Sequence, residues 1–67
     1  MPNMTEPRRH ALGKRLLELR KARDLTIREA SAKIKVSERT WRAWERNEFA
    51  PSEAHLVLIE LLEAGKL

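Results

Sequence analysis

The sequence predicts an all-α protein, and three observations lead to that prediction. It has no run of alternating apolar and polar residues, which would indicate a strand, and only two glycines. Alanine, leucine, glutamate and arginine, which favour helices, dominate the composition. Apolar residues recur at helical spacing, as at Leu12, Leu16 and Leu19, with polar residues between them. We therefore expect the 67 residues to form one small helical domain.

The first half of the chain is predicted to hold a flexible N-terminus and two helices. The flexible part covers residues 1–7, and the first helix runs from there to about Arg23. Thr26 is a favourable N-cap for a second, short helix. Glu29 stands three residues after it, which is the spacing of a capping box.

The second half is predicted to hold two more helices. Ser37 caps a third helix over residues 38–46, and Asn47 follows it, a residue that tolerates the left-handed conformation in which helices often end. Ser52 caps a fourth helix that ends near residues 64–65. The predicted ranges are 8–64 for the domain, 26–47 for its central helix-turn-helix unit and 53–67 for an apolar C-terminal segment.

Basic residues are concentrated in the body of the chain. Residues 8–47 hold thirteen Lys/Arg and five Asp/Glu, whereas residues 48–67 hold one lysine and four glutamates. A basic body with an acidic, leucine-rich tail indicates that the two parts face different partners. A solvated basic surface without a partner is the alternative.

Trp41 and Trp44, the two tryptophans of the chain, fall in its most arginine-dense segment. On a helix that begins at Glu38 they are three residues apart and share one face. We interpret them as core residues that anchor this helix, and not as a platform for stacking single-stranded bases. The opposite face then presents Glu38, Arg39, Arg42 and Ala43 outward, with Arg46 at the far end.

Several other functions lack the residues they need. The chain has no cysteine, and its two histidines, His10 and His55, have no partners at metal-ligand spacing, so we expect no metal. No apolar run approaches the ~20 residues of a membrane span, and the first residues do not form a secretory signal. No nucleophile–base pairing or phosphate-binding glycine loop is present. We therefore predict a protein that is not an enzyme and that uses no cofactor.

The stretch LTIREASAKIKVSERTWRAWERN resembles the Cro/C1-type (XRE-like) helix-turn-helix repressors. VSERTWRAWERN followed by FAPSEA is similar to their short single-domain members, and the similarity covers roughly residues 12–62. It implies a compact lambda-repressor-like domain of four helices, or of five. In such domains the third helix enters the major groove of B-DNA. The resemblance also implies a phage or bacterial protein that works in the bacterial cytoplasm, associated with the nucleoid.

Carried over position by position, the family's base-reading sites fall on the third helix. Arginine can donate two hydrogen bonds to guanine, glutamate can accept one from cytosine, and an alanine methyl can contact thymine. Glu38 has an alternative role as a first-turn carboxylate that favours the helix dipole. The implied base contacts are Glu38, Arg39, Thr40, Arg42 and Ala43, and the implied phosphate contacts are Thr26, Ile27, Arg28, Ser37, Arg46 and Asn47.

Further expectations rest on the same resemblance. Arg20 and Glu45 are expected to form an ion pair that attaches the third helix to the first, in addition to its tryptophans. The alternative is that they are two unrelated surface charges. Lys35 replaces the glycine that the family prefers in the turn, so a positive φ with some strain is expected there. Ile27 replaces a glutamine that commonly touches a phosphate, so we expect that contact to be lost. The sequence stops at Leu67, before the position of the fifth helix that builds the dimers of many family members.

The predicted function is that of a sequence-specific regulator of transcription that binds double-stranded DNA as a homodimer. We expect a repressor that occupies a palindromic operator, excludes polymerase and is able to repress its own operon. The alternative is a protein-interaction module such as an antitoxin subunit, and an anti-CRISPR-associated regulator fits the resemblance equally. An RNA-binding protein is a third reading, less favoured because it needs exposed aromatic rings for unstacked bases.

The C-terminal segment 53–67 is the predicted dimerisation element. Five of its apolar residues suffice for a core-facing stripe, and the remaining ones would form an exposed cluster of the kind that marks an interface. The alternative is that these leucines fold back over the first helix, near Leu17, and complete the core of the monomer. The predicted core stripe is Ala54, Val57, Leu58, Leu61 and Leu62, and the predicted interface is Leu56, Ile59 and Leu67.

Overall fold

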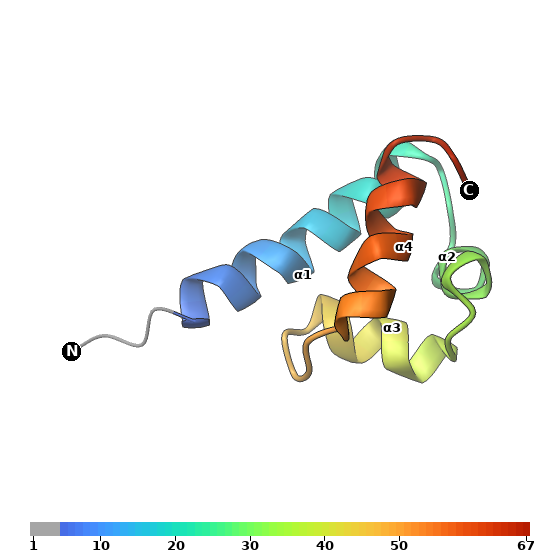
Figure 1. Cartoon of the computed structure of the whole chain (residues 1–67). Helices are drawn as coiled ribbons and strands as arrows, with labels where there is room; N and C mark the ends of the chain where they lie inside the picture. The colour runs from blue at the N-terminus through green and yellow to red at the C-terminus, as the bar shows by residue number, and fades with distance from the viewer. Residues whose placement is uncertain (1–4) are drawn as a thin grey trace.

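Four helices form the part of the protein that the structure describes, and the all-α prediction is confirmed (Figure 1). The computed structural model describes residues 5–67, with side chains from Leu12 onward. The described residues hold neither a strand nor a fifth helix. In chain order, the helices are α1 at Thr5–Ala22, α2 at Ile27–Ile34, α3 at Glu38–Glu45 and α4 at Glu53–Glu63.

Helix α1 begins earlier than the sequence predicted. Its first residue is Thr5, so residues 5–7 lie within the helix, whereas the sequence placed its start after them. Residues 1–4 lie outside the described residues. Proline fits the first turn of a helix because its φ is already helical and its missing N–H has no partner there in any case. Pro7 therefore allows the helix to start before it.

Side-chain caps set where α2, α3 and α4 begin, as predicted. Thr26 Oγ1 accepts a hydrogen bond from the Glu29 N–H at 3.1 Å, and the Glu29 carboxylate accepts one from the Thr26 N–H at 2.9 Å. The backbone and hydroxyl hydrogen bonds from Thr26 hold the pKa of the Glu29 carboxyl below its usual value. Ser37 and Ser52 cap α3 and α4 by accepting from the N–H three residues on, at 3.1 and 3.3 Å.

One or two residues after each helix ends, the chain passes through a residue with a positive φ. In every case the N–H of the residue after it bonds across the last turn to a helix carbonyl, at 2.8–3.0 Å. The positive φ predicted for Lys35 is confirmed, and it costs about 1 kcal/mol because the Cβ crowds the backbone in this region. The four residues are Asp24 at 55°, Lys35 at 64°, Asn47 at 61° and Gly65 at 76°.

One core joins all four helices, and each helix contributes two apolar side chains to it. In Figure 1 α4 runs between the C-terminal end of α1 and α3, whereas the N-terminal half of α1 extends away from the other helices. A core shared in this way lets none of the helices move independently of the rest. Its buried members are Leu16, Leu19, Ala30, Ile34, Trp41, Trp44, Ile59 and Leu62.

Helix α4 turns a different face to the core than the sequence predicted. Ile59 is fully buried, so its predicted place in a dimer interface is wrong, and Leu56 is half-buried and packs against the core. Ala54 and Val57, which were predicted to point inward, are exposed, Val57 to 54%. Leu67 is exposed to 43%, as an interface residue would need to be.

The reason for this error lies in the composition of α4. Six of the seven residues in 56–62 are apolar, so two stripes on the helix offer similar apolar area and periodicity cannot choose between them. Packing makes the choice. Ile59 and Leu62 fit among the core side chains of the other three helices, so the side of α4 that carries them faces inward.

Ionic contacts tie α1 to α4 in a way that the sequence did not predict. Arg15 Nε donates to the Glu63 carboxylate at 2.6 Å, and Arg23 Nη2 donates to the Glu63 carbonyl at 2.9 Å. The hydrogen bonds from Arg15 hold the pKa of the Glu63 carboxyl below its usual value. The pair is partly exposed, so it orients α4 more than it stabilises the fold.

Candidate nucleic-acid interface

Helix α3 has one buried face and one exposed face. Trp41 and Trp44 are 0% and 4% exposed, which confirms that they are core residues, and their ring centroids lie 5.9 Å apart. Trp44 also lies against His55 of α4, with centroids 5.4 Å apart. On the other face Glu38, Arg39 and Arg42 are exposed, and Thr40 and Ala43 are half-buried.

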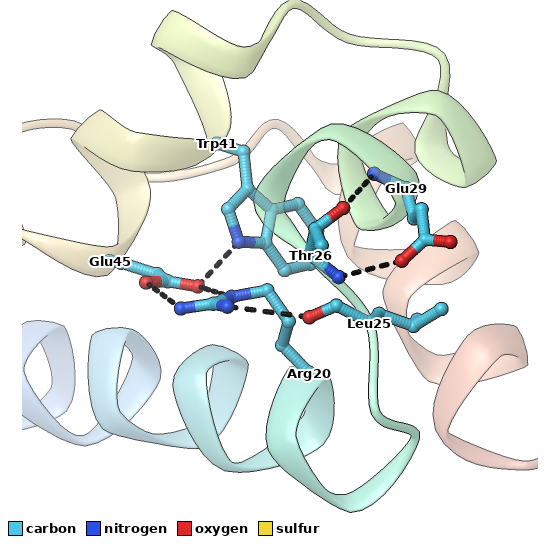
Figure 2. A network of polar contacts seen from close by, with 6 residues as sticks. All are labelled: Arg20, Leu25, Thr26, Glu29, Trp41 and Glu45. Carbon is cyan, nitrogen blue, oxygen red and sulfur yellow. Dashed lines mark hydrogen bonds and ion pairs between the residues drawn. The ribbon is translucent and has the colours of Figure 1, made fainter.

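A polar network under α3 fixes its orientation. Arg20 Nε donates to Glu45 Oε2 at 2.8 Å, and Arg20 Nη2 donates to Glu45 Oε1 at 3.3 Å (Figure 2). The Trp41 Nε1–H donates to the same Oε2 atom at 2.5 Å. The hydrogen bonds that Arg20 donates to Glu45 raise the pKa of the Arg20 guanidinium. The structure thus brings Arg20 and Glu45 together and adds Trp41 as a third member.

The same network reaches the start of α2. Arg20 Nη1 donates to the carbonyl of Leu25 at 3.3 Å, and the capping box of Thr26 and Glu29 follows directly (Figure 2). Arg20 therefore contacts both the end of α3 and the connection into α2.

Two backbone N–H groups in the first turn of α2 have no hydrogen-bond partner among the described residues. The capping box uses the N–H groups of Thr26 and Glu29, which leaves those of Ile27 and Arg28 for an anion. The Arg28 side chain is exposed, whereas Ile27 is half-buried and packs against the core. The Thr26 hydroxyl oxygen accepts a hydrogen bond from the Glu29 N–H within the cap.

The end of α3 is held against α1 at Gly13. The Gly13 N–H donates to Asn47 Oδ1 at 3.2 Å. A Cβ on Gly13 would lie 2.7 Å from both that oxygen and the Glu45 carbonyl oxygen, so only glycine allows this approach. The Asn47 amide nitrogen also lies against Gly13, 2.8 Å from where such a Cβ would be. Arg46, the residue before it, is exposed and lies 3.9 Å from the carboxylate of Glu48.

A groove of about 600 Å³ lies beside the C-terminal half of α3. Three arginines of α3 and its cap, Arg39, Arg42 and Arg46, line it. Trp44 and Phe49 supply apolar surface to the same groove, and Phe49, from the loop after α3, is 67% exposed. The outer face of α3 is thus strongly basic, and it carries an aromatic ring at one end.

Comparison with protein families matches residues 16–62 to the family described as Helix-turn-helix. The match covers more than half of the chain. The protein belongs to the Cro/C1-type helix-turn-helix family. Comparisons with curated proteins and with solved structures found no match.

In this helix-turn-helix regulator, α2 is the first helix of the motif, residues 35–37 are the turn and α3 is the second helix. The regulator binds double-stranded DNA, as its family does. Members of the family are regulators and not typically enzymes. Among the described residues, no helix is long and apolar enough to cross a membrane, and no group of three or more His, Asp or Glu is placed to hold a metal ion.

Two residues next to the helix-turn-helix escaped the sequence reasoning. Gly13 sits in the middle of α1, where glycine weakens a helix, and that conflict was the available signal that another backbone approaches closely. Phe49 lies in a loop that sequence reasoning passed over. Its signal was a lone large apolar residue between a predicted cap and a proline, which no helical stripe could bury.

Proposed function

We propose that the protein represses transcription by binding a palindromic operator as a homodimer, with α3 in the major groove. The observation that best supports this is the contrast between the faces of α3. Trp41 and Glu45 fix one face, whereas Arg39 and Arg42 stand exposed on the other. Forked contacts from arginine to guanine need a rigidly held helix, since they are directional. An operator placed within a promoter, including the protein's own, would exclude polymerase sterically.

Each exposed group has a role in this proposal. The arginine pair reads guanine O6 and N7, Glu38 accepts from cytosine N4, and the Ala43 methyl meets thymine. The N-terminus of α2 and the C-terminal end of α3 contact phosphates on either side of the groove. The proposed base contacts are Glu38, Arg39, Thr40, Arg42 and Ala43, and the proposed phosphate contacts are Thr26, Arg28, Ser37, Arg46 and Asn47.

Two arginine variants test the division between base and phosphate contacts. A binding selection from random duplex DNA first returns the operator, its symmetry and its half-site spacing. Arg39→Ala should then lower operator affinity by ~1–3 kcal/mol and relax the preference at one base pair of each half-site. Arg46→Ala should weaken binding to operator and random duplexes alike and flatten the salt dependence. Equal loss from Arg39→Ala on both duplexes would contradict its assignment to base reading.

Dimerisation through the outer face of α4 remains part of the proposal, with corrected residues. Ile59 and Leu56 belong to the monomer core, so they leave the interface. Val57 and Leu67 are exposed, and Ala54 lies beside Val57 one turn earlier on the same side of α4. Exposed apolar residues such as these support a contact with a second copy. Two-fold symmetry would then set two α3 helices about 34 Å apart, one turn of duplex.

Val57→Glu tests the dimer, because the side chain is exposed and the monomer should fold normally. We expect monomers by sedimentation and operator binding weaker by roughly a hundredfold or more, since the second half-site no longer adds to the first. Ile59→Glu is the contrasting variant, and it should unfold the protein because Ile59 is fully buried. Unmodified protein that sediments as a monomer, both free and on its operator, would rule out the dimer.

A protein partner is the second candidate, and the exposed Val57 and Leu67 are what favour it. An antitoxin would cover this face of α4 with its toxin in place of a second copy. Co-purification from the native host separates the two, because a repressor dimer elutes with DNA alone and an antitoxin elutes with a second polypeptide in fixed ratio. A location in the bacterial cytoplasm, on the nucleoid, goes with either role.

A further inference from the structure

Phe49 is the most exposed large apolar side chain of the described residues, at 67%. It is not among the partly buried residues that pack against the core, such as Leu12, Leu25 and Val36. It lines the groove beside α3 together with arginines of the recognition face. A ring left in water at this place has no structural purpose within the monomer.

The loop that carries Phe49 is anchored at both ends. On one side the Glu48 N–H donates to the Ala43 carbonyl at 2.9 Å and Asn47 is bound to α1 through Gly13. On the other side Pro51 is buried. Only three residues lie between Asn47 and Pro51, so the ring has little room to leave the groove. A partner therefore meets it in a nearly fixed position, at a low entropic cost.

The chemistry of the groove limits which partner fits. An apolar protein surface would cover the ring, but it would also remove water from the guanidiniums of Arg39, Arg42 and Arg46 without offering them an anion, which is costly. The face of α4 around Val57, which has no arginine beside it on that helix, suits such a surface better. A DNA strand supplies what the groove needs, since phosphates alternate with the apolar faces of deoxyribose along it.

We propose that Phe49 packs against a deoxyribose of the operator, next to the phosphate that Arg46 contacts. This inference rests on the proposed insertion of α3 into the major groove. The ring extends the interface beyond the end of α3, onto the flank of each half-site. Glu48, the one acidic residue that lines the groove, lies 3.9 Å from Arg46 and is half exposed, so it can turn to solvent when a phosphate takes its place.

The salt dependence of binding distinguishes this contact from an ionic one. An apolar contact with a sugar releases no counterions. Loss of one phosphate contact, in contrast, lowers the magnitude of the slope of log K against log salt by about 1. Phe49→Ala should therefore weaken binding to the selected operator by about tenfold per half-site while the slope stays unchanged. Arg46→Ala is the matched ionic variant, and it should lower the slope. Phe49→Leu keeps apolar area and should retain most of the affinity.

Two control measurements test whether Phe49→Ala leaves the fold and the oligomeric state unchanged. Thermal unfolding and sedimentation of Phe49→Ala should match those of the unmodified protein, because the ring is exposed. Unchanged operator affinity would overturn the proposal. If Phe49→Ala reduced the magnitude of the salt-dependence slope as much as Arg46→Ala does, the proposal would also be overturned, because the ring would then act through Arg46. Dissociation of the dimer by Phe49→Ala would assign the ring to a second copy instead. If Phe49→Ala and Arg39→Ala both leave operator affinity unchanged, the insertion of α3 into the major groove is wrong, and this inference is wrong with it. If Phe49→Ala leaves the affinity unchanged but Arg39→Ala lowers it, only this inference is wrong.

Discussion

Replacing Trp41 with alanine should leave most of the protein unfolded at room temperature. The side chain is fully buried, and removing it loses apolar contacts and leaves a cavity, at a cost of ~3–5 kcal/mol. A domain of 67 residues has roughly 3–10 kcal/mol of stability in total. The same change removes the indole N–H that donates to Glu45. Circular dichroism during urea titration measures the loss.

Two other aromatic variants show whether burial is the cause. Trp41→Phe keeps most of the apolar volume and loses only the N–H donor, so it should stay folded with a loss of about 1–2 kcal/mol. Phe49→Ala removes an exposed ring and should change the unfolding free energy by less than about 0.5 kcal/mol. Trp41→Ala should lose DNA binding because it unfolds. Native helical content in Trp41→Ala, with DNA affinity alone lost, would mean that the indole touches DNA.

Replacing Glu45 with alanine has the second largest expected effect. The carboxylate is the acceptor for Arg20 and for Trp41, and the Arg20 and Glu45 side chains are only 19% and 12% exposed. The variant leaves a mostly buried guanidinium without its anion and an indole N–H without an acceptor. We expect a loss of about 3 kcal/mol, at the lower end for buried pairs because some solvent remains. Urea unfolding followed by tryptophan fluorescence measures it.

A double-mutant cycle separates the ion pair from the indole bond. Arg20→Met combined with Glu45→Leu removes both charges and should recover most of the stability, apart from about 1 kcal/mol for the unpaired Trp41 N–H. The exposed pair of Arg46 and Glu48, at 3.9 Å, is the matched control, and Glu48→Ala should change stability by less than about 0.5 kcal/mol. Losses that simply add in the Arg20→Met and Glu45→Leu cycle would show that the two charges do not interact.

The helix-turn-helix unit was predictable because its signals are local. A capping box, a serine cap and a pair of tryptophans three residues apart each act within one or two turns of helix. They set where α2 and α3 begin and which side of α3 faces inward. The outward set, from Glu38 to Ala43, then follows from helical geometry alone. The role of these residues toward DNA is a prediction that the monomer does not test.

Contacts between distant segments were harder to predict. Gly13 and Asn47 are in contact, and nothing in the sequence around either residue predicts the other as its partner. The Trp41 bond to Glu45 adds a third member to a pair that the family resemblance implied with two. Phe49 had no helical stripe to join, so its exposure became clear only when the groove beside α3 was formed.

The sequence by itself determined the all-α class, the beginnings of the last three helices and the anchoring of α3, because caps and amphipathic spacing act over a few residues. Only the tertiary structure decided which face of α4 is buried. Its apolar residues allow two rotations of similar free energy, and the choice depends on the fit of Ile59 and Leu62 among side chains from the other three helices. Packing of that kind is a property of the assembled core, in which every volume must be filled at once.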